Sequence, residues 1–194
     1  LDNLTSFEGS ASLGDMVLVS SATASSSASI EFTLGDYKEY KFFFVNMHPQ
    51  NDGTGSLEFN FSTDSGSTYA TTKTTTQFIT YHDEAGGQTN LGYYTSGDLA
   101  QSTSFQQLSR NLGGQADESL SGHMSIFNPS STTYVKHFIS NTQEVVNDIG
   151  GVSEGSLQCF VAGYANTTSA LTNIKFQMTS GNIDDGKILM FGFN

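Results

Sequence analysis

The sequence predicts an all-β protein, an antiparallel β-sandwich of jelly-roll type with about ten strands and at most one short helix. Apolar and polar residues alternate with period two in several segments, as they do in strands with one buried face. Clusters of Gly, Asn, Ser and Pro separate these segments, which is typical of turns between strands. The chain holds 15 Phe and 8 Tyr, and only 13% of its residues are charged. A disordered chain would combine few aromatic residues with a high charge content.

The 194 residues are expected to form a single domain, residues 15–194, preceded by an N-terminal arm, residues 1–14. A chain of this length buries about 70% of its unfolded surface, which is enough for one core without disulfides. The arm has no hydrophobic period, but it carries Leu4, Phe7 and Leu13 among polar residues. We expect these three side chains to bind a partner, with a frayed terminus as the simpler alternative.

In the first half of the chain, the apolar pattern predicts strands in residues 16–19, 30–34, 37–47, 57–61 and 78–81. The alternation is cleanest at Leu57, Phe59 and Phe61, which would face one side of a sheet. Residues 42–45 are apolar at every position instead, and this predicts a central strand covered on both faces. Pro49 ends that strand, because proline cannot donate a hydrogen bond to a neighbouring strand.

One segment, residues 98–112, is a candidate helix. Four of its apolar residues can share a helix face, and two glycines follow that would terminate the helix: Leu99, Phe105, Leu108 and Leu112, then Gly113 and Gly114. The Ser and Thr residues inside the segment argue against a helix, because they lower helix propensity.

The segment 118–140 is predicted to form a β-hairpin. Leu120, Met124 and Ile126 alternate with polar residues, and β-branched and aromatic residues return after residue 132. Between them, Asn128 and Pro129 begin a polar turn, since proline fixes its own backbone and asparagine bonds to the local chain. Beyond the hairpin we expect a long polar loop in residues 141–156. Three strands follow, in residues 157–164, 173–178 and 187–193.

Composition narrows the function classes. Lys and Arg number 7 against 19 Asp and Glu, which gives a net charge of −12. Such a surface repels phosphate backbones and anionic lipids, so we expect no nucleic-acid or membrane partner. No apolar run approaches the ~20 residues of a membrane span. The single cysteine, Cys159, lies in an apolar segment, where a buried, unreactive thiol is expected.

Several residues could in principle form a metal site or a catalytic site. The candidate ligands are His82, Asp83, Glu84, His48, His123, His137, Asp184 and Asp185. Their spacing matches no common metal motif, and acidic residues in turns usually serve backbone geometry, so we expect no metal and no cofactor. His123 and His137 are expected to face each other across the hairpin as structural residues. No serine elbow and no phosphate-binding loop occurs, and we therefore expect no enzyme activity.

Four segments carry a resemblance to a known family. They read TASSSASIEFT (23–33), YKEYKFFFVNMHP (37–49), SGHMSIFNPSSTTYVKHFIS (121–140) and FVAGYANTTSALTNIKFQMTSGNIDDGKILMFGF (160–193). In this order they resemble small virion structural proteins encoded by tailed bacteriophages. The resemblance covers most of residues 23–193. It implies a β-sandwich subunit on the outer surface of a phage particle, without a catalytic residue or cofactor.

Within that family, the leading expectation is a capsid decoration or cement protein that binds the major capsid protein or other virion proteins. The alternative is the receptor-binding domain of a tail fibre or spike, which would bind a carbohydrate or a protein. A lectin or a carbohydrate-active enzyme on the same kind of sandwich is a third possibility. We also expect a homotrimer, because residues 42–45 and 187–193 are apolar on both faces and one sandwich buries only one face of each sheet.

Overall fold

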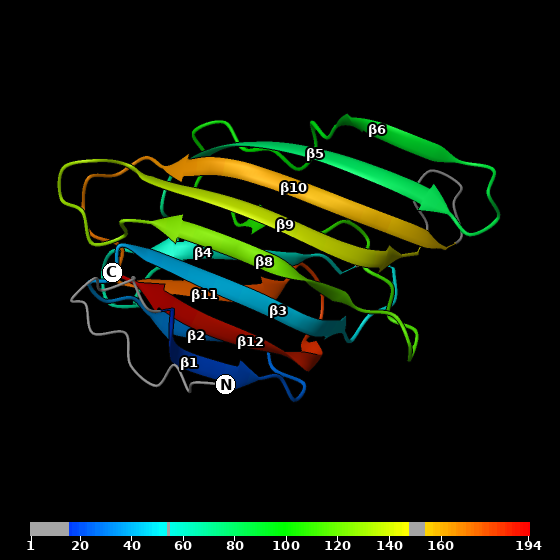
Figure 1. The fold of residues 1–194 in the computed structure, drawn as a ribbon, viewed down its shortest axis with the longest axis horizontal. Coiled ribbons are helices and arrows are strands. Elements are labelled where there is room, and N and C mark those ends of the chain that lie inside the picture. Colours follow the sequence, from blue (N-terminus) through cyan, green and yellow to red (C-terminus); the bar gives the residue numbers. More distant parts are fainter. Residues whose placement is uncertain (1–15, 54, 148–153) are drawn as a thin grey trace, which may run out of the picture.

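Twelve strands form two antiparallel sheets in the computed structural model, which describes residues 16–53, 55–147 and 154–194 (Figure 1). The larger sheet has eight strands, in spatial order β1 (Val17–Thr23), β12 (Ile183–Phe193), β3 (Glu39–Pro49), β8 (Leu120–Phe127), β9 (Lys136–Val146), β10 (Gly155–Ala165), β5 (Lys73–Asp83) and β6 (Thr89–Tyr93). The smaller sheet has four, in order β2 (Ile30–Thr33), β11 (Asn173–Met178), β4 (Leu57–Ser62) and β7 (Gln106–Gln107). The predicted all-β sandwich is confirmed.

The core lies between the two sheets. Figure 1 shows the strands of the small sheet behind β12, β3 and β8 of the large one. Phe176 on β11 contacts Phe42 and Phe44 on β3, each at 5.4 Å between ring centroids, and Phe59 on β4 packs edge-on against Phe138 on β9 at 5.2 Å. These rings are almost completely buried. We call the side of the eight-stranded sheet that faces this core the inner face and the opposite side the outer face.

The prediction of a helix in residues 98–112 is wrong, because the segment forms irregular turns and the two-residue strand β7. Leu108 and Leu112 are fully buried, as the helix prediction required, but they reach the core from an extended backbone. The Leu108 and Leu112 amides donate to the Leu57 and Gly55 carbonyls along the edge of β4. The segment thereby covers the part of the inner face that the small sheet leaves open.

Two further expectations need correction. Half of the predicted polar loop at residues 141–156 belongs to strands, because β9 runs on to Val146 and β10 begins at Gly155. β3 is central in its sheet, but only its inner side is covered: Phe44 is buried, whereas Val45 stays 42% exposed on the outer face. No second layer lies over the outer face within the part of the chain that the structure describes.

Candidate binding face

A row of mostly aromatic side chains crosses the outer face from β12 to β6. Each member is the register partner of the next, so the row lies perpendicular to the strands: Leu189, Phe43, His123, Asn141, Phe160, Phe78 and Tyr93. We call this set the aromatic row. Directly opposite residues in antiparallel strands have their Cβ atoms about 5 Å apart, so neighbouring rings can touch. Phe78 and Phe160 do so, stacked at 4.6 Å with an interplanar angle of 13°.

Apolar side chains around this row remain in contact with water. Phe78 is 41% exposed, Tyr93 56% and Ile139 54%. Val45, Leu91 and Phe127 are also exposed on this face. A monomeric protein seldom leaves a contiguous apolar surface of this kind without a use, since such patches mark interaction sites. The outer face is therefore the candidate binding surface of the molecule.

The outer face has two chemically different halves. Over β12 and β3, charged residues stand among the aromatic ones: Glu39, Lys41 and Lys187. The Lys41 ammonium group lies 5.5 Å from the centre of the Phe43 ring, a cation–π contact. We call this region the charged half. Its neighbour β1 is an edge strand that exposes Val17, Leu18 and Val19.

The second region, over β9, β10, β5 and β6, we call the uncharged half. Three shallow hollows follow one another along it, and none of them is lined by Asp, Glu, Lys or Arg. In a protein with a net charge of −12, a stretch in which the described lining residues include no Asp, Glu, Lys or Arg is a specific feature of the surface. His123 borders it, and burial together with the nearby Lys41 lowers the pKa of His123, which keeps the imidazole neutral at pH 7.

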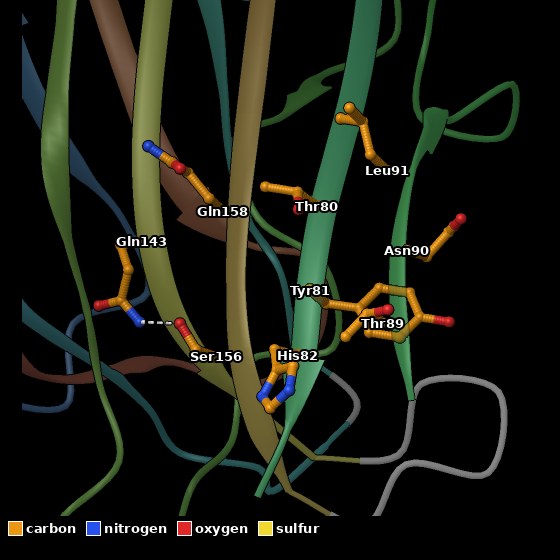
Figure 2. A pocket seen from close by; sticks show the side chains of 9 residues that line it. All are labelled: Thr80, Tyr81, His82, Thr89, Asn90, Leu91, Gln143, Ser156 and Gln158. Carbon is orange, nitrogen blue, oxygen red and sulfur yellow. Dashed lines mark hydrogen bonds between the residues drawn. The ribbon is translucent and has the colours of Figure 1, made fainter. Parts of the chain in front are cut away.

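One of these hollows, which we call the amide hollow, is lined mainly by polar side chains. Figure 2 shows Gln143 and Ser156 on one side of it, Gln158 and Thr80 above them, and Asn90 and Leu91 on the far strand. Gln143 Nε2 donates to Ser156 Oγ at 3.4 Å, and Gln158 Nε2 donates to Asn141 Oδ1 at 2.9 Å. Within the described residues, the amide oxygens of Gln143 and Gln158 accept no hydrogen bond and stay available to a ligand.

The other two hollows meet at Ala162 and Ile139 on neighbouring strands. One is lined in part by Phe78 and Phe160, and the other by His137 and Tyr164, whose rings lie 6.3 Å apart. Ala162 lies between Phe160 and Tyr164 on the same side of β10, and its small side chain leaves the space open. We call the two together the aromatic hollow.

The structure separates the histidine and acidic residues that the sequence suggested as ligands. His82 lines the amide hollow, whereas the neighbouring Asp83 is buried and its carboxylate accepts the Gln88 amide at 2.8 Å. The expectation that His123 and His137 face each other is wrong: the register places Asn141 opposite His123 and Tyr164 opposite His137. Within the described ranges, no group of three His, Cys, Asp or Glu side chains could hold a metal ion.

A second cleft, between the ends of β3, β8 and β12, is acidic. It is lined by His48, Asp117, Glu118, Asp184 and Asp185 among others. Glu118 is buried and accepts the Gln115 amide at 2.6 Å. Burial raises the pKa of Glu118, and the Asp52 and Glu154 carboxylates raise it further. These effects favour the neutral form of Glu118 more than in a solvent-exposed glutamate, and its hydrogen bond to the Gln115 amide indicates a structural role.

Sequence analysis missed the polar groups that are buried on the inner face. Lys73 is fully buried, and its ammonium group donates to Asn60 Oδ1 at 2.5 Å and to the Thr71 carbonyl at 2.9 Å. Burial lowers the pKa of Lys73 to about 7. Glu144 is also fully buried and accepts the Arg110 amide at 2.7 Å, and burial raises its pKa well above the ordinary value. Both stand at inner positions of their strands, but the predicted strands included neither residue, so no local signal marked them.

The arm residues Leu4, Phe7 and Leu13 lie outside the described residues. No helix in the described part is long and apolar enough to cross a membrane. A comparison of the chain with models of known protein families finds no match, and a comparison with curated proteins finds none either.

Proposed function

We propose that the protein is a non-enzymatic structural protein that works by binding through the outer face of its eight-stranded sheet. The observation that carries this proposal is the aromatic row, a line of mostly aromatic side chains that crosses seven strands and faces solvent. Folding of the chain alone leaves these rings in contact with water, so their burial is available to stabilise a complex. The hollows of this face are lined by amides, hydroxyls and rings, a set suited to binding.

The resemblance to phage virion proteins supports binding at the outside of a phage head. The protein would act as a decoration or cement protein that contacts the major capsid protein and bridges neighbouring shell subunits. We assign the shell contact to the charged half and the edge strand β1. Val17 to Val19 add apolar contact area there, and the arm with Leu4, Phe7 and Leu13 precedes this strand directly. Many weak contacts per particle would add up through multivalency.

The decoration role is tested by adding the purified full-length chain to phage heads that lack it. We expect saturable binding at hundreds of copies per head and a higher temperature of head disruption, because a protein that binds only the assembled shell stabilises it. Phe43→Ser, in the charged half, and a chain without residues 1–14 should each bind at least about tenfold more weakly. Gln158→Ala, in the uncharged half, is the matched control. Failure to bind heads, or a location at the tail, would overturn the decoration role.

We also propose that the working form is a homotrimer, which buries part of the outer face between subunits. The apolar residues at both parities of β3 and β12 support it, since Val45 and Phe191 have no second layer over them within the residues that the structure describes. Sedimentation at micromolar concentration should give a mass of about three chains. A monomer under these conditions would contradict the trimer but leave head binding as an independent question.

The second candidate is a receptor-binding domain of a tail fibre or spike. The amide hollow favours it, because uncharged hydrogen-bonding groups in a surface hollow recognise ligands more specifically than a flat apolar patch does. A few to dozens of copies at the tail, seen in images of the particle, would support this candidate over head decoration.

A further inference from the structure

We propose that the uncharged half of the outer face, where the amide hollow adjoins the aromatic hollow across β9, β10 and β5, binds an uncharged oligosaccharide chain. This inference specifies the ligand of the receptor-binding candidate. It does not depend on head decoration, which we assigned to the other half of the face. The two proposals are tested with different variants and can therefore fail separately.

The amide hollow supplies the hydrogen bonds that sugar hydroxyls require. A hydroxyl group donates one hydrogen bond and accepts others, so a sugar is matched by side chains that offer both kinds of group. Gln143 and Gln158 present amide oxygens without a partner in the described residues, and Thr80 on β5 is the register partner of Gln158. These side chains stand on regular strands, which hold their positions more firmly than loops would.

The aromatic hollow supplies an apolar surface for the C–H faces of sugar rings. Phe160 and Phe78 stack on each other, which fixes both rings upright on the sheet. Ala162 follows Phe160 on the outer side of β10, and Tyr164 follows Ala162, so the open space lies between two aromatic side chains. A ring with one polar edge and one apolar face fits a hollow of this composition, whereas a purely polar ligand would leave the phenyl groups exposed.

Charge and length select among the possible ligands. The lining of all three hollows is free of Asp, Glu, Lys and Arg, and the whole protein carries a charge of −12. A polyanionic chain would be repelled without finding a cation, so an uncharged chain is the complementary ligand. The hollows extend along β10 from Ser156 to Tyr164. At about 3.3 Å per residue this is roughly 26 Å, the length of several sugar units in line and far more than a monosaccharide needs.

A second copy of the chain is a less suitable occupant of this half. Closing two such faces on each other would bury the side-chain amides of Gln143 and Gln158 without water. Each buried amide left without a partner would weaken that contact, because the amide loses its hydrogen bonds to water. A sugar bound in the open hollow avoids this loss, because its hydroxyl groups and bridging water molecules keep the amides hydrogen-bonded. The charged half and β1 do not carry such a set of amides, and they remain the better surface for protein contacts.

The test is affinity electrophoresis of the full-length protein in native gels that contain one polysaccharide each. The uncharged probes are dextran, laminarin, galactomannan and glycol chitin, a soluble polymer of N-acetylglucosamine. The anionic probe is alginate. We expect retardation by at least one uncharged probe and none by alginate. Gln158→Ala and Phe160→Ala should each weaken the retardation at least about tenfold, with melting temperatures within about 3 °C of the parent. Phe43→Ser, on the charged half, should leave it unchanged.

Three results would overturn the inference. The first is no retardation by any uncharged probe, and the second is retardation by alginate alone. The third is that Phe160→Ala turns an oligomer into a monomer in sedimentation without any polysaccharide, because this half would then be an interface between copies. Loss of head binding by Phe43→Ser with unchanged glycan binding would separate the two halves cleanly. Head binding can fail while glycan binding stands.

Discussion

The two faces of β9, β10 and β5 each hold some side chains of the kind that a sheet usually places on the opposite face. A sheet with one face on the core commonly buries apolar residues and exposes polar ones. Here the inner face holds Lys73, Gln77 and Glu144 without exposure, while the outer face presents Phe78 and Phe160 to solvent. These polar groups stand beside apolar ones such as Phe138 and Val161, whereas the interior near β3 and β12 is built on rings such as Phe42.

The difference separates what folds the protein from what the protein offers to a partner. Neighbouring groups satisfy most of the buried polar groups: Gln106 Nε2 donates to the Gly97 carbonyl at 2.8 Å, and Thr75 Oγ1 donates to Gln106 Oε1 at 2.6 Å. Glu144 is satisfied at one carboxyl oxygen, while Oε2 has no hydrogen-bond partner among the described residues. Such networks favour one arrangement of the segment that covers the inner face. The outer aromatic side chains have no comparable role in folding. We infer that they are present for binding, and the predictions below test this contrast.

The largest expected effect comes from the aromatic core. Phe59→Ala removes a ring that packs against Phe61, Phe138 and Phe176, and it should lower the free energy of unfolding by about 3–5 kcal/mol. Phe160→Ala, on the outer face, should cost only about 1 kcal/mol, the worth of its stacking on Phe78. Urea unfolding of both variants measures the difference. Equal losses would show that the outer face belongs to the core.

A smaller effect is expected where a buried charge loses its partner. Asn60→Ala removes the side-chain acceptor of the Lys73 ammonium group and should cost about 2–3 kcal/mol at pH 6. Lys73→Met removes the charge as well and should change stability by less than about 1.5 kcal/mol, because an apolar side chain of similar length replaces it. In the double variant, the cost of Asn60→Ala should shrink. Additive losses would mean that the two side chains are not coupled.

The pH dependence should show two opposite slopes. Between pH 7 and 10.5, the folded state has lost the Lys73 proton that the unfolded chain keeps, so stability from this group rises with pH. Glu144 acts in the other direction: above pH 4.5 the unfolded chain loses its proton while the folded state keeps it, so stability falls as pH rises toward the raised pKa. Melting curves should lose the first slope in Lys73→Met and the second in Glu144→Gln. Unchanged slopes would contradict both assignments.

Much of the fold could be predicted because alternation is a local signal. The strands around Phe59, Met124 and Ile174 lie where the pattern indicates, and the turn at Asn128 and Pro129 joins β8 to β9. The helix prediction for residues 98–112 failed because the spacing of Leu108 and Leu112 fits one face of a helix as well as it fits an extended segment. Hydrogen bonds to the edge of β4 decided its conformation, and these are contacts far apart in sequence.

The candidate site could be predicted less well, for a physical reason. Phe43, His123, Asn141, Phe160 and Phe78 form one row only because five strands pair in a particular order and register. Pairing of this kind is a property of the whole sheet and leaves no mark within one segment. Lys73 stood in a threonine-rich stretch whose strand was recognisable only from Phe78 onward. Its burial therefore could not be anticipated from its neighbours in the sequence.

The smallest expected effect is at Cys159, where we predict almost no reaction in the folded state. The thiol faces inward on β10 and is 1% exposed, and Gln77 Nε2 donates to its sulfur at 2.9 Å. Burial raises the pKa of Cys159 to about 12, and the nearby Glu144 adds to this. Since the thiolate is the reactive form, a disulfide reagent at pH 8 should label the native protein at least about a hundredfold more slowly than the urea-unfolded chain.

Ala162→Cys supplies the matched control, because it places a second thiol on the outer side of the same strand, three residues along. This variant should react in two phases of one thiol each, fast for Cys at 162 and slow for Cys159. A single fast phase would show that the inner face opens readily, and the contrast between the two faces would then fail at the position where it is sharpest.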